Sequence, residues 1–211
     1  MTDFFQAGGR WRGVVAALLL APWLSGCITK QTVGNDSTVA GTVQVCSSCH
    51  GLEGRSVNPT FPILAGQQHD YLVAQLKAFR DKTRADPHAH TYMWGMAAKL
   101  SDATIEGVAS YYAGQAPEPG QKQDAALVSA GQAIFKTGIS ARNVPACGDC
   151  HGETAGGNGA IPRLASQHQE YLAGQLQAFA INSRANEMMH ENAKNLTAQE
   201  IQAVTSYLAS L

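Results

Sequence analysis

The sequence predicts an all-helical protein built from two similar domains in tandem. Apolar residues recur at the i, i+4, i+7 spacing that lines one face of a helix, as at Leu72, Leu76 and Phe79. No convincing alternation of apolar and polar residues, the pattern of a half-buried strand, runs along the chain. The helical pattern returns 100 positions later, which indicates a duplicated domain. The repeated residues are Pro62, Leu64, Ala65, Gln67, Tyr71, Leu72, Gln75, Leu76, Ala78, Phe79, Arg84 and Ala85, matched by Pro162, Leu164, Ala165, Gln167, Tyr171, Leu172, Gln175, Leu176, Ala178, Phe179, Arg184 and Ala185.

Capping residues mark where two of the helices begin. Ser101 follows Leu100 and precedes apolar positions at helical spacing, so we expect it to be an N-cap. Thr197 and Glu200 have the spacing of a capping box at the start of the last helix. The predicted helices, in chain order, lie near residues 39–45, 72–79, 101–112, 124–137, 172–179 and 197–208.

A linker separates the two copies. Residues 114–121 read GQAPEPGQ, and proline and glycine at this density are tolerated by neither helix nor strand. We therefore expect the first domain at residues 39–116, the linker at 117–123 and the second domain at 124–211. Domains of this size have a marginal apolar core of their own, so a large buried group would supply much of the missing interior.

Two pentapeptides, one in each copy, carry the motif C-x-x-C-H. This motif is typical of covalent haem c attachment, in which two thiols bond one porphyrin and the histidine binds its iron. A C-x-x-C turn also occurs in redox dithiols and zinc sites. A redox dithiol, however, does not need the following histidine, and a zinc site needs further ligands at finger-like spacing. We expect two haem c groups; the predicted attachment residues are Cys46, Cys49, Cys147 and Cys150, and the predicted iron ligands are His50 and His151.

The methionines are candidates for the sixth iron ligand. Apart from Met1, all lie in two clusters, and Met93 and Met189 each stand seven residues before the matched positions Leu100 and Leu196. We therefore expect Met93 and Met189 to bind iron. The neighbouring Met96 and Met188, which do not correspond in the repeat, remain the alternatives. A thioether favours ferrous iron and raises the reduction potential relative to two histidines, and a filled sixth position leaves no vacancy for a substrate.

Repeated prolines and arginines are candidates for groups around the haem. Pro62 and Pro162 follow their haem histidines by 12 and 11 residues, and a proline carbonyl can accept a hydrogen bond from the imidazole N–H. The alternative for each proline is an ordinary loop turn. Arg84 and Arg184 either pair with haem propionates or lie exposed at a helix end, and the sequence favours neither interpretation.

The N-terminal segment is predicted to direct export. An apolar run from Val14 to Leu24 follows Arg10 and Arg12 and ends in LSGC, which is similar to the lipobox of bacterial lipoproteins. We expect residues 1–26 to be removed as a signal peptide, Cys27 to carry lipid, and residues 27–38 to tether the protein to a membrane in the periplasm. The alternative is an ordinary signal peptide cut elsewhere. Four of the five cysteines belong to the haem motifs, so no disulfide is expected.

The charge balance argues against a nucleic-acid partner. Removal of residues 1–26 leaves 13 basic and 15 acidic residues out of 15 and 16, and no basic stripe is present. A redox protein that docks on a mostly neutral surface is the expected partner.

Taken together, the C-x-x-C-H-G sites, the P-x-L-A segments and the Y-L-x-x-Q-L-x-x-F helices resemble cytochrome c4, a family of two-domain dihaem class I cytochromes c. The resemblance covers the chain from about residue 40 to its end. It implies two cytochrome c folds related by an approximate two-fold axis, with Pro62 and Pro162 as hydrogen-bond acceptors for the axial histidines. It also implies electron exchange with respiratory partners such as a terminal oxidase or a quinol-oxidising complex.

These features favour a non-enzymatic electron carrier that relays single electrons between respiratory partners. The alternatives are the electron-accepting cytochrome subunit of a periplasmic dehydrogenase, or a small dihaem peroxidase. A peroxidase needs an open or displaceable iron site with acid-base groups above it, whereas both methionine clusters offer a ligand at equivalent spacing.

Overall fold

The computed structural model describes residues 37–211, and within that range the chain is helical, as predicted. No strand forms among the described residues, which contain only two isolated bridges, Ile139 with Val144 and Asn158 with Ile161. The predicted signal peptide at 1–26 and the lipid-bearing Cys27 lie outside the described residues, as does most of the predicted tether.

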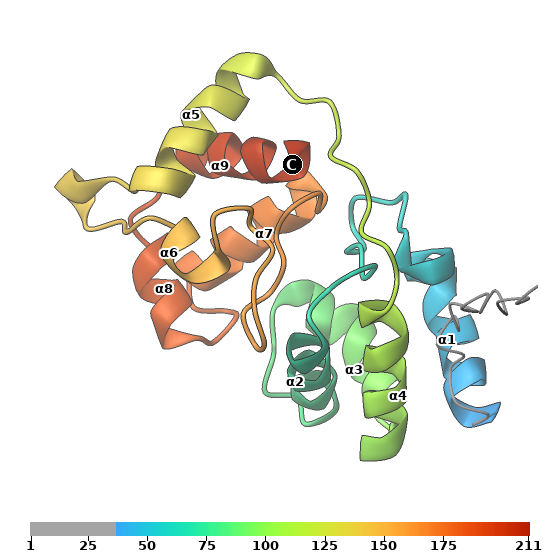
Figure 1. Ribbon diagram of the computed structural model, residues 1–211. Coiled ribbons are helices and arrows are strands. Elements are labelled where there is room, and N and C mark those ends of the chain that lie inside the picture. Colours follow the sequence, from blue (N-terminus) through green and yellow to red (C-terminus); the bar gives the residue numbers. More distant parts are fainter. Residues whose placement is uncertain (1–36) are drawn as a thin grey trace, which may run out of the picture. The chain divides into compact units, whose positions relative to one another are not determined.

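The first half of the described chain is built on three main helices (Figure 1). Helix α4 packs against both α1 and α2, and Val39, Leu72, Val108 and Tyr112 fill the core between them. Gly107 allows the close approach of α1, because a Cβ there would lie 2.6 Å from a Val39 methyl carbon. The elements of this half are α1 (Ser37–His50), η1 (Leu52–Gly54), α2 (His69–Arg80), η2 (Ala89–Met93), α3 (Trp94–Ala97) and α4 (Asp102–Ala113).

The second half repeats this plan. Helices α5 and α9 cross closely, with α7 against α9 and α8 against α7 (Figure 1). A Cβ on Gly131 would overlap the carbonyl oxygen of Ala203, so only glycine permits this crossing. Phe135, Val204 and Leu208 lie in the core. The elements are α5 (Ala125–Thr137), η3 (Ser140–Arg142), α6 (Gly148–His151), α7 (Gln169–Ala180), α8 (Glu187–Ala193) and α9 (Ala198–Ser210).

The predicted caps start their helices. The Ser101 hydroxyl accepts from the backbone N–H of Thr104, which satisfies one of the free donors in the first turn of α4. Thr197 and Glu200 form the full capping box at the start of α9. The predicted helix over 124–137 begins one residue later, because Asp124 is its N-cap.

The two halves differ in the segment before their last helix, α4 in the first half and α9 in the second. Arg84 and Leu100 are 16 residues apart, whereas Arg184 and Leu196 are 12 apart, so the first half holds four extra residues here. It accommodates them with a π-helical turn, η2, that ends at Met93, where the second half has the regular helix α8. Such turns are often found at functional sites.

The halves are joined by residues 115–124, which form no helix. Arg55 of the first half pairs with Glu118 in this segment. Among the residues that the structure describes, no helix has the length and apolarity required to cross a membrane.

Candidate haem sites and the interface between them

Each C-x-x-C-H motif ends a helix and buries its histidine. His50 is the last residue of α1 and His151 the last residue of α6, and each is 7% exposed. The Nδ1 atom of His50 lies 2.9 Å from the carbonyl oxygen of Pro62, and Nδ1 of His151 lies 3.1 Å from that of Pro162. A carbonyl can only accept, so each ring carries its proton on Nδ1.

This arrangement leaves each histidine ready to bind a metal through Nε2. Burial lowers the pKa of both His50 and His151, although the hydrogen bond to the proline carbonyl partly opposes this shift. The rings are therefore neutral at pH 7, and the proline fixes which nitrogen keeps its lone pair. A neutral imidazole of fixed tautomer is the usual form of a metal-binding histidine.

The four motif cysteines form no disulfide and differ in exposure. Cys46 and Cys147 are partly buried, whereas Cys49 and Cys150 are exposed. Burial raises the pKa of Cys46, and it raises that of Cys147 to about 11, so both are neutral thiols at pH 7. The members of each pair are three residues apart along helical backbone and therefore share a face.

A cavity of about 880 Å³ is lined by the predicted haem-site residues of both halves except Cys49. His50 and Met93 line it in the first half, and His151 and Met189 line it in the second. Met96 does not line the cavity and is 55% exposed. Met188, the alternative ligand in the second half, lines the cavity but is 65% exposed, whereas Met189 is partly buried. The predicted attachment residues Cys46, Cys147 and Cys150 also line it.

The cavity fits a large, mostly apolar group with polar edges. Its walls include aromatic and aliphatic side chains such as Phe79, Leu72 and Leu172. Tyr112 also lines the cavity, and its hydroxyl is the buried side-chain polar atom of the described residues for which no hydrogen-bond partner is found. A buried hydroxyl without a partner is costly, and a propionate-bearing porphyrin would offer it an acceptor. The paired thiols, fixed imidazoles and nearby thioethers are the donor set of haem c.

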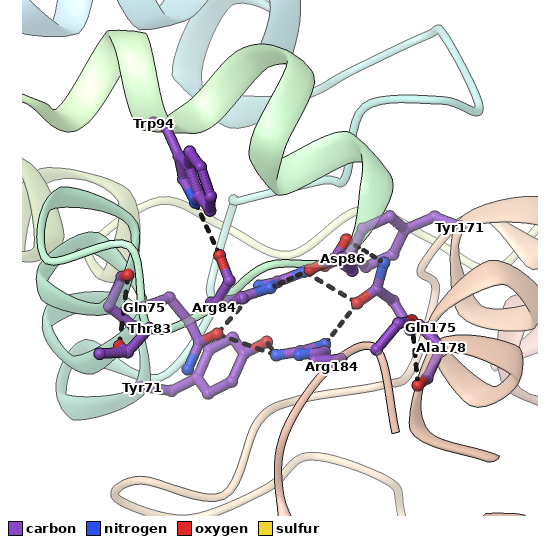
Figure 2. A network of polar contacts seen from close by, with 12 residues as sticks. Tyr71, Gln75, Thr83, Arg84, Asp86, Trp94, Tyr171, Gln175, Ala178 and Arg184 are labelled. Atoms are coloured by element: carbon purple, nitrogen blue, oxygen red, sulfur yellow. Dashed lines mark hydrogen bonds and ion pairs between the residues drawn. The ribbon is translucent and has the colours of Figure 1, made fainter. Parts of the chain in front are cut away.

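A network of buried polar side chains joins the two halves beside this cavity (Figure 2). The Arg84 guanidinium donates to Gln75 of its own half at 2.9 Å and to Gln175 of the other half at 2.8 Å. Arg184 makes the reciprocal pair of bonds, to Gln175 at 2.6 Å and to Gln75 at 2.9 Å. Each guanidinium also packs over the phenylalanine ring of its own α2 or α7 helix and reaches a tyrosine hydroxyl of the other half. The two arginines are thus buried, and the exposed helix-end position is excluded.

Asp86 breaks the symmetry of this network. Its carboxylate accepts from Arg84 Nε at 2.8 Å and lies 3.5 Å from the Gln175 amide nitrogen (Figure 2). Burial opposes ionisation, but the positive charge of Arg84 and its hydrogen bond outweigh this effect, and the pKa of Asp86 lies below its usual value. The repeat places Asn186 at the matching position, where it caps α8.

Sequence reasoning missed several interface residues. No feature of the sequence singled out His168 as an interface residue, yet its ring is buried and its Nε2 lies 2.9 Å from the carbonyl oxygen of Ser56 in the other half. Asp86 also went unnoticed, although its mismatch with Asn186 in an otherwise regular repeat was a visible signal.

Comparison with known proteins agrees with this geometry. The cytochrome c family model matches the chain twice, at residues 40–114 and 128–211. A cytochrome c4 from Thiocapsa roseopersicina is 39% identical over 173 residues, which cover 79% of this chain and 87% of that protein. A solved cytochrome c4 structure from Acidithiobacillus ferrooxidans superposes with a TM-score of 0.76 at 40% identity, covering 80% of this chain and 99% of the other. A thiosulfate dehydrogenase electron acceptor from Thiomonas intermedia is 34% identical over 173 residues, or 78% of this chain and 77% of that protein.

Two cytochrome c folds, each with its own C-x-x-C-H motif, define a dihaem cytochrome c that carries one covalent haem c per domain. Its function is electron transfer. More narrowly, the chain belongs to the cytochrome c4 family.

Proposed function

We propose that this protein relays single electrons through two six-coordinate haems, with His50 and Met93 as the axial ligands of the first and His151 and Met189 as those of the second. The observation that carries the proposal is that each histidine and its paired methionine line one cavity. When bound, haem c supplies an iron that cycles between ferric and ferrous states.

The protein's own residues hold that iron site rigid. The carbonyls of Pro62 and Pro162 fix the histidine rings, and the four attachment thiols would tether the porphyrin edges at Cys46, Cys49, Cys147 and Cys150. Thioether ligation favours the ferrous state, and two filled axial positions leave nowhere for a substrate to bind. The donor set therefore supports a carrier without an enzymatic activity of its own.

The axial assignment is tested by exchanging methionines one at a time. In Met93→His and Met189→His, each variant is expected to lose half of the long-wavelength sulfur-to-iron absorption band and to lower one of the two midpoint potentials. Met96→Leu and Met188→Leu are the matched controls and are expected to keep the full band. If a control variant loses half of the band instead, the methionine replaced in that control, Met96 or Met188, is the ligand.

Carbon monoxide distinguishes a carrier from a peroxidase. Reduced protein with two filled axial positions is expected to bind carbon monoxide slowly and incompletely. Rapid stoichiometric binding to the unaltered protein would contradict six-coordination and favour an enzyme.

For the partner, we propose respiratory redox proteins such as a terminal oxidase or a quinol-oxidising complex. A second candidate is a periplasmic dehydrogenase, because two curated relatives are named thiosulfate dehydrogenase electron acceptors. Stopped-flow reduction by a purified thiosulfate dehydrogenase with thiosulfate separates the two. Reduction within the enzyme's turnover time supports the dehydrogenase, whereas no reduction above the rate without enzyme excludes it.

We further propose that the chain is exported to the periplasm, cut before Cys27 and anchored there by lipid, with domains at 39–116 and 124–211 joined by the linker 117–123. The lipobox-like sequence before Cys27 supports the anchor. Mass spectrometry of the mature N-terminus is expected to find a lipidated Cys27 in the unaltered chain and its loss, with release from membranes, in Cys27→Ser. An unmodified N-terminus at any other residue would contradict the anchor.

A further inference from the structure

Two buried glutamines pair with backbone in the opposite half of the molecule. The side-chain oxygen of Gln167 accepts from the N–H of Ile63 at 2.8 Å, and its amide nitrogen donates to the Ile63 carbonyl at 2.9 Å. Gln67 makes the same pair of bonds to Arg163, at 2.8 and 2.9 Å. Since each amide meets both a backbone donor and a backbone acceptor, its orientation is fixed by its partners.

These bonds fall on the peptide units that hold the haem histidines. The carbonyl of Pro62 and the N–H of Ile63 belong to a single planar peptide unit. His50 donates to that carbonyl, and the N–H of the same unit donates to Gln167. A continuous chain of hydrogen bonds thus runs from the His50 ring, through one peptide, to a side chain of the second half.

The second half contains the equivalent series of hydrogen bonds, which starts from His151. His151 donates to the carbonyl of Pro162, and the N–H of Arg163, in the same peptide unit, donates to Gln67 of the first half. Both glutamines are at most 7% exposed, so water does not compete for these bonds. Each glutamine oxygen also accepts from the N–H of the following residue, at 2.9 Å for Gln67 and 3.1 Å for Gln167, which fixes the side chain in place.

We propose that Gln67 and Gln167 are positioning residues that act across the interface, so that each domain sets part of the reduction potential of the haem in the other. Hydrogen bonds in series polarise one another. The glutamine oxygen accepts a hydrogen bond from the peptide N–H. This bond polarises the peptide unit and makes its proline carbonyl a stronger acceptor. The stronger acceptor leaves more electron density on the axial imidazole, and this stabilises ferric iron.

The proposal rests on the proposed function, because it takes His50 and His151 to bind iron. It predicts a crossed effect: a change in one domain alters the potential of the haem in the other. Gln167→Met keeps the length of the side chain but removes both bonds to Ile63. The midpoint of the first-domain haem is expected to rise so that its ferrous-to-ferric ratio at fixed potential grows about threefold, equivalent to about 28 mV at 59 mV per tenfold change. Gln67→Met is expected to raise the second-domain midpoint by a similar amount.

Gln68→Met is the matched control. Its amide also crosses the interface, donating to the Gly156 carbonyl at 2.8 Å, but Gly156 is not part of a peptide that accepts from a haem histidine. This variant weakens the interface and is expected to move neither midpoint by more than the measurement error.

The measurement is an optical redox titration of the holoprotein, with the two haems assigned through Met93→His and Met189→His. An equal shift of both midpoints, a shift confined to the haem of the altered domain, or no shift would overturn the proposal. If the glutamine variants do not fold, nuclear magnetic resonance of the reduced, unaltered protein provides the test. We expect scalar coupling through the hydrogen bond between the Ile63 amide nitrogen and the Gln167 side-chain carbonyl carbon. Its absence would overturn the proposed series of hydrogen bonds from His50 to Gln167.

Failure of the proposed iron ligation and failure of the proposed crossed effect give different results. If His50 and His151 do not bind iron, the unaltered protein lacks the six-coordinate low-spin spectrum before any glutamine is changed. If only the crossed effect is wrong, that spectrum is intact and the midpoints alone fail to respond.

Discussion

Replacing Asp86 with asparagine changes the charge balance at the centre of the domain interface. The carboxylate is 1% exposed and lies 2.8 Å from the Arg84 Nε atom. With the two charge centres about 4 Å apart, their attraction is about 4 kcal/mol at an effective dielectric constant of about 20. Removal of one partner from a buried pair typically costs about 3–5 kcal/mol, because the other charge stays buried.

The expected loss of stability in Asp86→Asn is smaller than that range. Arg84 keeps the oxygens of Gln75 and Gln175 as acceptors, and the new amide still offers one oxygen. We therefore expect the free energy of unfolding to fall by about 2 kcal/mol at pH 7, which lowers the thermal midpoint of a chain of this size by about 4–8 °C.

The pKa of Asp86 determines how the stability difference between the unaltered protein and Asp86→Asn changes with pH. The pKa of Asp86 is lower in the folded protein than its unfolded value of about 3.9, so its contribution is complete well above pH 4 and is lost as the pH falls through the folded pKa. The stability gap between the unaltered protein and the variant should therefore be widest near neutrality and close under acid conditions.

The assay is thermal unfolding of the holoprotein by circular dichroism between pH 3 and pH 7. Asp102→Asn is the control, since Asp102 pairs with Arg80 at 2.6 Å on an exposed surface where ion pairs contribute little. If the two variants have the same midpoint at pH 7, or if the Asp86 gap widens in acid, the buried pair does not stabilise the interface as argued.

Two further predictions concern the helices. Gly131→Ala should destabilise the holoprotein by about 3 kcal/mol, because its Cβ would overlap the α9 backbone. The control Gly174→Ala, which has open space around it in α7, should be neutral or stabilising by up to about 1 kcal/mol. Equal thermal midpoints for the two variants would refute the close crossing of α5 and α9. Thr197→Ala should lower the free energy of unfolding by about 1 kcal/mol through loss of the α9 cap, measured in guanidinium chloride, and an unchanged midpoint would show that Glu200 alone caps the helix.

The features that could be predicted from the sequence are those fixed by local chemistry. The Ser101 cap and the capping box at Thr197 depend on side chains within three residues of the backbone they bind. The C-x-x-C-H motif is equally local, because attachment of one porphyrin needs its groups within a single helical turn. The repeat added the domain plan, since two similar sequences fold alike.

The interface could not be predicted in this way, because its contacts join residues about 90 to 110 positions apart. Arg84 had no local feature to distinguish a buried guanidinium from an exposed one at a helix end. Its environment is set by Gln175 and Tyr171 of the other half. For the same reason nothing local in the sequence marks His168 as an interface residue, although its ring is hydrogen-bonded to the carbonyl oxygen of Ser56 in the other half.

The interface also explains why polar residues recur so regularly in the two copies. Contacts within one domain, such as the bond from Arg84 to Gln75, account for only part of what Tyr71, Gln75 and Arg84 do. They recur because the copies face each other, so that each residue meets the partner's version of the same set. The mismatch between Asp86 and Asn186 follows from this geometry: a second carboxylate in place of Asn186 would bring like charges toward one centre, whereas one carboxylate between two guanidiniums leaves a net positive interface beside the haem cavity.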